Sequence, residues 1–401
     1  MSKQHDVVIV GGGLVGSSLA VALDATGLDV GLVEATPGGA MPPVFDQRNL
    51  SFAAATINAL KRLDVLSRMR MAPSPIRRIH ISRAGDFGRI RLDASDYGRE
   101  FFGHVVVARE FGEALEARLA DLKRLTRYRS ARFVGFGPLS DTARTVRVID
   151  DGVERMLTAR LLVAADGTRS ETRAALGIGV QEHDYGQTLF VTRVRTARPP
   201  DGTAYERLGD DGPTALLPRS DRHYGLVHGV ARAEAEQVAA WPETAWLERI
   251  QRVFGWRVGR FLSSDARSAY PLIRVIADRL VAERAVLMGN AAQTIHPVGA
   301  QGFNLGLRDV LTLAEMLQAE PGCDPGADAL LARYAQRRGE DRTRTLAFSD
   351  NLARLTSNRG PLLRPLRSLG LLALDCSSSL QSFLVGGAMG FRGDVPELCR
   401  S

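Results

Sequence analysis

The chain has 401 residues, of which 45% are hydrophobic and 24% charged, and its formal net charge is +7. A chain of this length rarely folds around a single hydrophobic core, so we expect two structural domains that are interleaved along the sequence. The basic residues are almost all scattered arginines. No basic stripe alternates with aromatic residues, which argues against nucleic acid as a partner. Solvated arginine faces and a weak attraction to anionic membrane surfaces both remain open explanations for the charge.

The cysteines and the N-terminal segment indicate the compartment. Cys323, Cys376 and Cys399 have no metal-ligand spacing, so we expect free thiols in a reducing compartment and no metal site. The N-terminus has no signal-peptide architecture. No segment approaches the roughly 18 uninterrupted apolar residues that a membrane-spanning helix needs. We therefore expect a cytoplasmic protein, with peripheral membrane association as an alternative.

The first motif follows a short β-branched run at residues 6–10, which predicts a buried parallel strand. Gly11, Gly13 and Gly16 then form the pattern G-x-G-x-x-G, and a helix with a small, tightly packing face follows from Leu14. In such a turn the first glycine permits the tight bend, the second lets the backbone approach a pyrophosphate, and the third lets helix and strand pack closely. The helix N-terminus then binds the phosphates.

A second predicted strand at residues 29–33 ends at Glu34, which lies 18 residues beyond Gly16. A carboxylate at this place can accept hydrogen bonds from a ribose hydroxyl. Strand, glycine turn, helix and terminal acid therefore occur together, which predicts a dinucleotide site. These residues do not by themselves distinguish FAD from NAD.

Two further strand-to-turn units occur later in the chain. The apolar run 160–165 leads into Asp166 and Gly167, and the run 285–288 leads into Gly289 and Asn290. The stretch 299–306 is rich in glycine and opens into a predicted helix. It is either a second place where backbone approaches a flat or anionic ligand, or a glycine-rich packing junction.

In this order and at these separations, the three motifs resemble the FAD-dependent aromatic hydroxylases over residues 5–345. The resemblance implies an α/β fold of the GR2 flavin hydroxylase type. It implies a Rossmann-like FAD-binding domain, an interleaved antiparallel-sheet substrate domain and a C-terminal helical tail. It also implies a flavoprotein monooxygenase that uses O2. The chain has no second strand–G-x-G-x-x-G–helix unit. As in the family, NAD(P)H is therefore expected to bind briefly as reductant.

The resemblance also assigns residues to the cofactor. Asp166 and Gly167 match the motif that braces the flavin site, and Asn290 stands where most members carry an aspartate that binds the ribityl chain. The run from Pro297 to Asn304 matches the segment around the isoalloxazine ring, where backbone N–H groups can stabilise negative charge. The expected cofactor-binding residues are Gly11, Gly13, Leu14, Val15, Gly16, Glu34, Arg48, Arg109, Asp166, Gly167, Gly289, Asn290, Pro297, Gly299, Ala300, Gln301, Gly302 and Asn304.

Within the family, Asn290, Gln293 and His296 together resemble the branch of ubiquinone-biosynthesis hydroxylases that acts on 2-polyprenyl-6-methoxyphenol. That resemblance implies ring hydroxylation through a C4a-hydroperoxyflavin. The chain departs from the family at Gly299-Ala300, where members usually have Ala-Gly, so an extra methyl group lies near the expected flavin.

Several alternatives remain open. The protein could hydroxylate another ring position or another phenol, or it could be a non-catalytic flavin-binding assembly protein of a lipid-biosynthesis complex. The sequence does not identify a base that ionises the phenol. His296 is a weak candidate for catalysis, and a structural role before the proline turn is an equal alternative.

The middle of the chain changes to short alternating strands at 189–194, 204–208, 214–217 and 224–230, to which 77–92 is expected to add strands. We expect Leu216, Pro218 and Tyr270, together with Leu217 and Pro271, to line an apolar substrate cavity. The expected domains are an FAD-binding domain at 1–72, 103–175 and 276–345, a substrate domain at 73–102 and 176–275, and a helical region at 346–401.

The expected helical region is unusually apolar, with leucines from Leu362 to Leu374 and interspersed arginines. It could pack against the FAD-binding domain. Alternatively, it could dock on a membrane surface or on partner enzymes of a ubiquinone-biosynthesis complex, which would suit a prenylated substrate.

Overall fold

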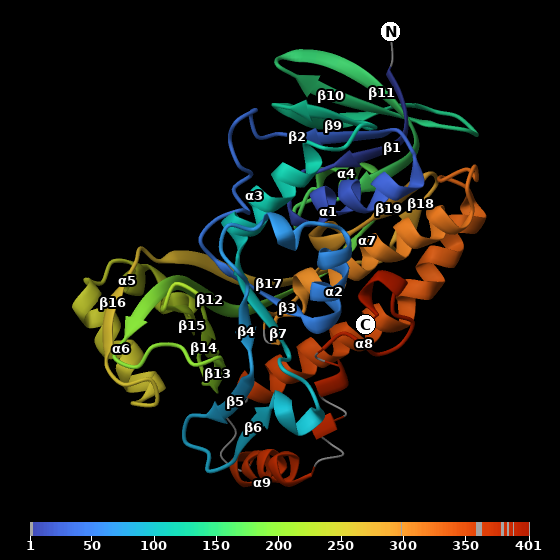
Figure 1. Cartoon of the computed structure of the whole chain (residues 1–401). Coiled ribbons are helices and arrows are strands. Elements are labelled where there is room, and N and C mark those ends of the chain that lie inside the picture. Colours follow the sequence, from blue (N-terminus) through green and yellow to red (C-terminus); the bar gives the residue numbers. More distant parts are fainter. Residues whose placement is uncertain are drawn as a thin grey trace.

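The computed structural model describes residues 3–297, 299–357, 363–377, 381–382, 385–387 and 389–400. Two large sheets and a small one are combined with helices, and the long helices α7 (Gly302–Ala319) and α8 (Asp328–Ser357) lie along one side (Figure 1). The predicted α/β class is therefore confirmed.

The first large sheet contains the predicted parallel strands. Its order is β18-β19-β11-β1-β2-β8, with β10 antiparallel to β11 and β9 antiparallel to β10. Neighbours among β19, β11, β1, β2 and β8 are parallel. The bounds are β1 (Lys3–Val10), β2 (Val30–Glu34), β8 (Leu125–Arg129), β9 (Ala131–Leu139), β10 (Arg144–Asp150), β11 (Val153–Ala164), β18 (Val281–Ala282) and β19 (Ala285–Leu287).

This sheet is buried on both faces, as continuous apolar parallel strands require. Helices α1 (Leu14–Ala22), α3 (Ala108–Leu119) and α7 share one core with alternate residues of β1, such as Val7 and Ile9. The intervening residues Val8 and Val10 face a second core, formed with β9 and β10. The N-terminus of α1 follows the carboxyl end of β1, the edge of the sheet where α/β folds bind ligands.

The second large sheet has nine strands in the order β20-β17-β12-β15-β14-β13-β5-β6, with β16 attached to β12. It confirms the expected strands and the contribution of residues 77–92. Its pairs are antiparallel except that β13 and β5 run parallel, which refines the expectation of a purely antiparallel sheet. The bounds are β5 (Arg78–Arg83), β6 (Arg89–Asp93), β12 (Val180–Thr196), β13 (Thr203–Leu208), β14 (Thr214–Pro218), β15 (Tyr224–Ala231), β16 (Phe261–Ser264), β17 (Ser268–Ala277) and β20 (Gln293–Thr294).

Smaller elements join the two sheets. A three-stranded sheet is formed by β3 (Asn49–Ala53), β7 (Gly103–Val107) and β4 (Ser74–Ile76). The remaining helices are α2 (Ala54–Arg62), α4 (Glu171–Ala175), α5 (Ala235–Ala239), α6 (Glu243–Phe254) and α9 (Leu363–Cys376). The short 3-10 turns are η1 (Leu23–Thr26), η2 (Leu66–Arg68), η3 (Ala94–Tyr97), η4 (Arg232–Glu234), η5 (Gly289–Ala291) and η6 (Glu397–Cys399).

The C-terminal part differs from the expectation in two ways. Helix α8 continues without a break across residues 345 and 346, where we expected a boundary, because no glycine or proline interrupts it there. Helix α9 packs against β6 of the nine-stranded sheet rather than against the parallel sheet. Leu369 and Leu372 of α9 are exposed. Leu362, Phe383 and Leu384 of the expected apolar tail lie outside the described residues.

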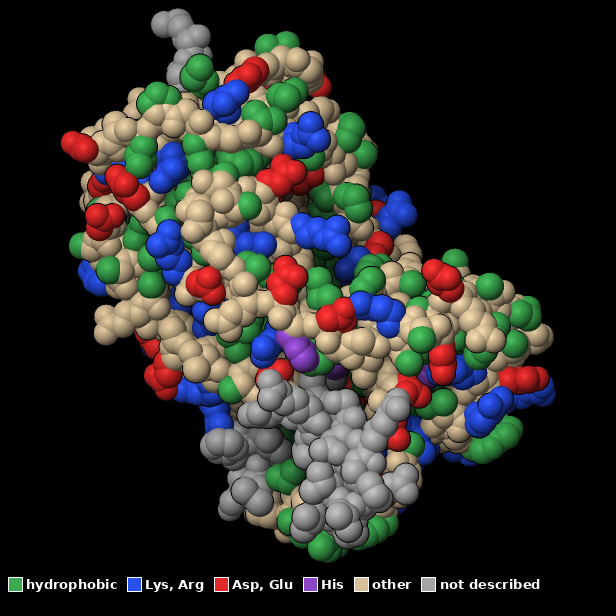
Figure 2. Space-filling view, turned by 180° about the vertical axis from the view of Figure 1, so that it is seen from behind, with side chains coloured by type: hydrophobic (Ala, Val, Ile, Leu, Met, Phe, Trp, Pro, Cys, Tyr) green, Lys and Arg blue, Asp and Glu red, His purple; other side chains and the backbone are tan. Residues whose placement is uncertain are grey.

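One face of the molecule shows how the charged side chains of the described residues are distributed. Basic and acidic side chains intermingle over the face shown in Figure 2. Many arginines form ion pairs, such as Arg193 with Asp265 and Arg337 with Asp394. Among the described residues, no helix combines the length and the apolar content that crossing a bilayer requires.

Candidate functional site

A cavity of about 1460 Å3 extends from the glycine turn after β1 to the nine-stranded sheet. Pockets for a single drug-sized ligand are typically ~300–1,000 Å3. The cavity therefore has room for a dinucleotide and for a second ligand beside it.

The glycines of the first turn differ in the space that the protein leaves for a side chain. A Cβ at Gly16 would lie 1.9 Å from the carbonyl oxygen of Gly11, and one at Gly11 would lie 2.4 Å from that of Ala165. Gly11 also has a φ of 107°, which favours glycine. A Cβ at Gly13, in contrast, would meet only Val44, at 3.5 Å. The space above Gly13 is therefore open to a ligand, whereas Gly11 and Gly16 are required by the protein itself.

Glu34 lies at the carboxyl end of β2 and lines the same cavity, as Leu14 and Val15 of α1 do. Its carboxylate accepts a hydrogen bond from the N–H of Gly12 at 2.8 Å and one from that of Thr36 at 2.7 Å. These bonds fix the carboxylate beside the first turn of α1. It is therefore placed to accept further hydrogen bonds from the hydroxyls of a ribose.

The Asp166-Gly167 motif lines the cavity and is organised by its own hydrogen bonds. The Asp166 carboxylate accepts bonds from the hydroxyl of Ser170 and from the N–H of Thr172, at 3.0 Å. Arg173 donates to the carbonyl oxygen of Ala291 at 2.9 Å. The motif is thereby tied to the turn η5, which carries Asn290 into the cavity.

We call the part of the cavity near the glycine turn, Glu34 and Asp166 the cofactor region. The start of α7 and the turn before it form another wall of this region. The residues of this wall that line the cavity are Pro297, Gly299, Ala300, Gln301 and Gly302. A Cβ at Gly302 would meet no described atom within 4 Å. The first N–H groups of a helix have no partner within the helix and can face a negatively charged ligand. Cavity and helix terminus therefore meet here, as the resemblance implied.

Asn304 also lines the cavity, but its side chain is fully used within the protein. Its oxygen accepts from the N–H of Ala53 at 2.9 Å and from the hydroxyl of Thr56 at 2.7 Å. Its nitrogen donates to the carbonyl oxygens of Ser51 and Ala300, at 3.0 and 2.7 Å. The side chain thus holds the turn before α7 against β3 and α2, a positioning role rather than a direct contact.

The departure at Gly299-Ala300 has a visible backbone consequence. Both residues have positive φ, 77° at Gly299 and 50° at Ala300. The left-handed conformation costs a residue with a Cβ about 1–2 kcal/mol, and glycine adopts it readily.

We expect Ala300→Gly to raise the free energy of unfolding by about 0.5–1 kcal/mol, because relief of this conformation outweighs the extra freedom of glycine in the unfolded chain. Urea unfolding measures the change. Ala40→Gly, at an exposed loop position whose own φ is not positive, is the matched control and should be destabilising. If Ala300→Gly lowered the free energy of unfolding as much as the control does, Ala300 would not have the left-handed backbone conformation described here.

Arg48 lines the cavity from the loop between β2 and β3 and is held by two partners. It donates to Asp46 at 2.8 and 2.7 Å and to the hydroxyl of Tyr270 at 3.1 Å, and its guanidinium lies 4.5 Å from the Tyr270 ring centroid. Burial alone would raise the pKa of Asp46, but the hydrogen bonds from Arg48 and Tyr270 outweigh it and lower that pKa. Asp46 is therefore ionised at neutral pH and orients Arg48.

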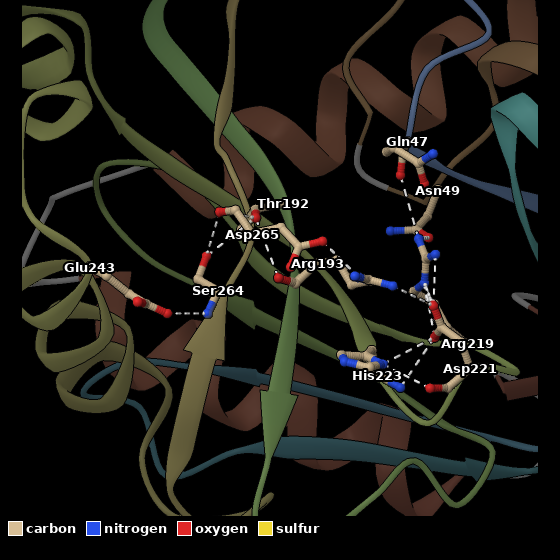
Figure 3. Close-up of polar contacts among 10 residues, drawn as sticks. All are labelled: Gln47, Asn49, Thr192, Arg193, Arg219, Asp221, His223, Glu243, Ser264 and Asp265. Carbon is tan, nitrogen blue, oxygen red and sulfur yellow. Dashed lines mark hydrogen bonds and ion pairs between the residues drawn. The ribbon is translucent and has the colours of Figure 1, made fainter.

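A second arginine joins this loop to the nine-stranded sheet (Figure 3). Arg219 follows β14, is buried, and binds Asp221 at 2.9 Å. It also donates to the side-chain oxygen of Asn49 at 3.0 Å and to the carbonyl oxygen of Gln47 at 3.5 Å. The sheet that forms the far wall of the cavity is thereby fixed to the loop that carries Arg48.

Three expected cofactor residues do not line the cavity. Gly16 lies behind the turn, and a Cβ at Gly289 would lie 2.7 Å from Val15, so both glycines serve the packing around α1. Arg109 directs its side chain to Glu113 at 3.3 Å, and its N–H donates to the carbonyl oxygen of Asp46. Its contribution is therefore to position the loop with Arg48.

His296 is buried and packs edge-to-face with Tyr185, with 4.9 Å between ring centroids. Its neighbours Ile295 and Pro297 line the cavity, whereas His296 does not. Burial lowers the pKa of His296 to about 4, so the imidazole is neutral at pH 7. The surroundings thus favour the structural alternative over catalysis.

Gln293 distinguishes the branch in sequence, and it too lies away from the cavity. Its amide donates to Asp309 at 2.8 Å and accepts from Arg342 at 3.0 Å. Its contacts are therefore with the buried charges beneath α7.

The nine-stranded sheet lines the remainder of the cavity with one face. Because side chains alternate along a strand, Ala215 and Leu217 face the cavity while Leu216 packs in the core beneath α6. The expectation for Leu216 was therefore wrong by one residue, and neither Pro218 nor Tyr270 lines the cavity. The apolar lining residues of this part, which we call the apolar lobe, are Ile79, Ile81, Ile90, Leu92, Ala204, Leu208, Pro213, Ala215, Leu217, Val227, Leu374, Val385 and Met389.

Glu206 also lines the cavity, beside the apolar lobe, and was not among the residues predicted from the sequence. The alternation of Ala204, Glu206 and Leu208 within a predicted strand was the available signal, since it places one acid on an otherwise apolar face.

These features define a class of protein. A Rossmann-like sheet presents an open glycine turn, a ribose acceptor and a second helix terminus to one cavity, and an apolar lobe adjoins them. The residues fit a bound FAD, because the phosphate-facing side at Gly13 is open and the cavity exceeds the size of one ligand.

Comparison with known families agrees with this class. The family model described as FAD binding domain matches residues 4–349, so the chain belongs to this family. The protein is thus an FAD-dependent oxidoreductase of the aromatic monooxygenase type, as the sequence predicted.

Individual relatives match over nearly the whole chain. The ubiquinone hydroxylase UbiL of Rhodospirillum rubrum is 34% identical over 391 residues, which cover 97% of this chain and 90% of the relative. The 3-demethoxyubiquinol 3-hydroxylase of Escherichia coli is 29% identical, covering 97% and 99%. The crystal structure of p-nitrophenol 4-monooxygenase PnpA from Pseudomonas putida superposes with a TM-score of 0.81 at 18% identity, covering 98% and 100%, which supports the fold.

Proposed function

We propose that this enzyme hydroxylates the aromatic ring of a polyprenylated methoxyphenol in ubiquinone biosynthesis, using O2 and NAD(P)H. The observation that carries the proposal is the apolar lobe, which adjoins the cofactor region within one cavity. The names of the relatives UbiL and 3-demethoxyubiquinol 3-hydroxylase support the pathway. A prenylated ring matches the lobe because burial of apolar surface drives its binding.

The protein's contribution is binding, orientation and exclusion of water. Bound FAD would activate O2, which provides the oxygen atom that is added to the ring. Gly13 and the start of α1 would hold the pyrophosphate, Glu34 a ribose, and Asn290 the ribityl chain. The first N–H groups of α7 would stabilise negative charge on the flavin ring. The apolar lobe would hold the substrate ring away from water.

The ring position is part of the proposal. Asn290, Gln293 and His296 resemble the branch acting on 2-polyprenyl-6-methoxyphenol, whereas the name of the Escherichia coli relative specifies another position. The sibling activity is therefore retained as the second candidate. We further propose the sequence-based domain division, amended so that α8 belongs wholly to the FAD-binding part. Contact of α9 with a membrane or a biosynthetic complex through Leu369 and Leu372 is also a proposal.

The purified protein should be yellow, and 2-polyprenyl-6-methoxyphenol should stimulate its oxidation of NAD(P)H. A strain lacking the gene should accumulate this phenol, identified by mass spectrometry. Accumulation of an intermediate that lacks a different ring hydroxyl would transfer the assignment to the sibling activity. A Gly302 variant in which NAD(P)H no longer reduces the bound flavin should not rescue the strain. Rescue by such a variant would instead indicate a non-catalytic assembly protein.

A further inference from the structure

One acidic side chain stands on the apolar wall of the cavity. Strand β13 directs Ala204, Glu206 and Leu208 to the same face, and all three line the cavity. In the sheet register, Glu206 lies opposite Ala215 of β14 and Ile81 of β5, which also line it. The carboxyl group therefore emerges among aliphatic side chains.

Among the residues that the structure describes, no side chain forms a hydrogen bond or an ion pair with the Glu206 carboxyl. Burial raises the pKa of Glu206 to about 7. An enclosed polar group without a partner is destabilising, so its presence needs an explanation.

Two other charged side chains, Arg83 and Asp86, line this wall, and the remaining charged side chains of the cavity lie on the cofactor side: Glu34, Arg48, Arg132, Asp166, Arg169 and Glu171. Arg83 of β5 forms ion pairs with Asp210 and with Asp86, the latter at 3.7 Å. On the cofactor side, Arg48 is paired with Asp46. Strands β6, β14 and β15 present only apolar side chains here, and α9 presents Leu374. A ligand in the lobe would therefore meet Glu206 as the hydrogen-bonding group of the aliphatic wall.

A phenol has the complementary chemistry, an apolar ring with one acidic hydroxyl. We propose that the Glu206 carboxylate binds the phenolic hydroxyl of the ring substrate and takes up its proton during hydroxylation. This inference rests on the proposed function and supplies the base that the motifs do not contain.

The proton and electron balance is straightforward. The phenolic O–H bond breaks, an O–H bond forms on Glu206, and the electron pair left on the phenolic oxygen increases electron density at the ring carbon para to it. That carbon gains a hydroxyl group whose oxygen comes from O2, and its hydrogen leaves as a proton. This proton joins the second oxygen atom of O2, which NAD(P)H reduces and which is released as water. Glu206 then returns its proton to the phenolic oxygen. A carboxyl group that titrates near neutral pH suits this exchange.

Glu206→Gln tests the proposal, because the amide has nearly the same shape and cannot accept the proton. With 2-geranyl-6-methoxyphenol as the probe, we expect formation of hydroxylated product by the FAD-loaded enzyme to fall at least ~100-fold. Product formation by the wild type should rise as the pH increases through about 7, where Glu206 loses its proton. That rise should be absent in the variant. Glu248→Gln makes the same charge change on the exposed surface of α6 and should match the wild type.

A stability measurement separates this function from a structural role. Because the pKa of Glu206 is raised in the folded protein, the folded state holds the proton more tightly than the unfolded chain. Wild-type stability should therefore fall as pH rises from about 4.5 through 7. Glu206→Gln and Glu206→Leu should remove this fall and raise the Tm at pH 8, since both remove a charge that lacks a partner.

Product formation and a pH profile like those of the wild type in Glu206→Gln would overturn the proposal. A lowered Tm with loss of FAD in both variants would also overturn it, because the carboxyl would then be a structural element. Failure of the wild type to hydroxylate any prenylated phenol would overturn the proposed function itself, and it would be seen without any variant.

Discussion

Gly13→Ala is expected to lower the affinity for FAD about 100-fold while the apoprotein keeps its fold. The added methyl group would meet only Val44, at 3.5 Å, so the protein itself accommodates it. It would, however, occupy the space through which a pyrophosphate approaches the first turn of α1. Loss of one or two hydrogen bonds to a charged group, at about 1.5–3 kcal/mol each, corresponds to this decrease. Titration of apoprotein with FAD, followed by quenching of flavin fluorescence, measures the affinity.

Two comparisons make this result specific. Gly339→Ala places a methyl group in open space on α8 and should leave FAD affinity unchanged. Gly16→Ala should behave differently from Gly13→Ala, because its Cβ would lie 1.9 Å from the carbonyl oxygen of Gly11 and would disturb the fold as well. Wild-type FAD affinity in Gly13→Ala would show that the pyrophosphate lies elsewhere.

The second large effect concerns a buried charge network beneath α7. Arg338 and Asp309 are 0% and 2% exposed in their side chains and are joined at 2.8 Å. Arg338 also binds Asp341 at 2.7 Å, and Asp309 accepts from Gln293. Burial alone would lower the pKa of Arg338, but the charges of Asp309 and Asp341 outweigh it and raise that pKa. The guanidinium is therefore always charged and depends on both carboxylates.

We expect Asp309→Asn to lower the free energy of unfolding by about 3–5 kcal/mol, the usual effect of removing one partner of a buried ion pair. Urea unfolding of the FAD-loaded protein measures it. Glu320→Gln breaks the exposed pair with Arg333 and should leave the midpoint unchanged. A similarly unchanged midpoint in Asp309→Asn would mean that Arg338 is solvated or otherwise compensated.

Much of the fold followed from local patterns. The parallel strands at 6–10, 29–33 and 285–288, and the helices that follow Gly13 and Gln301, were predicted within a few residues of where the structure has them. The strand predicted at 160–165 is the carboxyl-terminal half of a longer strand, β11, which begins at Val153. Apolar runs and glycine turns specify these elements within short stretches of chain, so a single sequence contains the necessary information. The domain boundary expected between residues 345 and 346 rested on a change of composition, and α8 continues across this point.

The candidate site was predicted in its cofactor half more fully than in its substrate half. Fifteen expected residues, among them Gly13, Glu34 and Asn290, line the cavity, and Gly16, Arg109 and Gly289 do not. In the substrate half, Leu216 was assigned to the wrong face. A shift by one residue reverses the face of a strand, and only pairing with neighbouring strands fixes that register.

By itself, the sequence determined the dinucleotide turn, the strands and helices that flank the motifs, and through these motifs the family and FAD as cofactor. Only the tertiary structure decided the roles of single residues that depend on contacts with distant segments of the chain. Asn304 binds Ala53 and Thr56, about 250 positions earlier, and so positions the turn before α7. Glu206 becomes an isolated carboxyl because β5 and β14 place Ile81 and Ala215 beside it. Such environments arise from segments distant in sequence, whereas glycine turns and apolar periodicity are local.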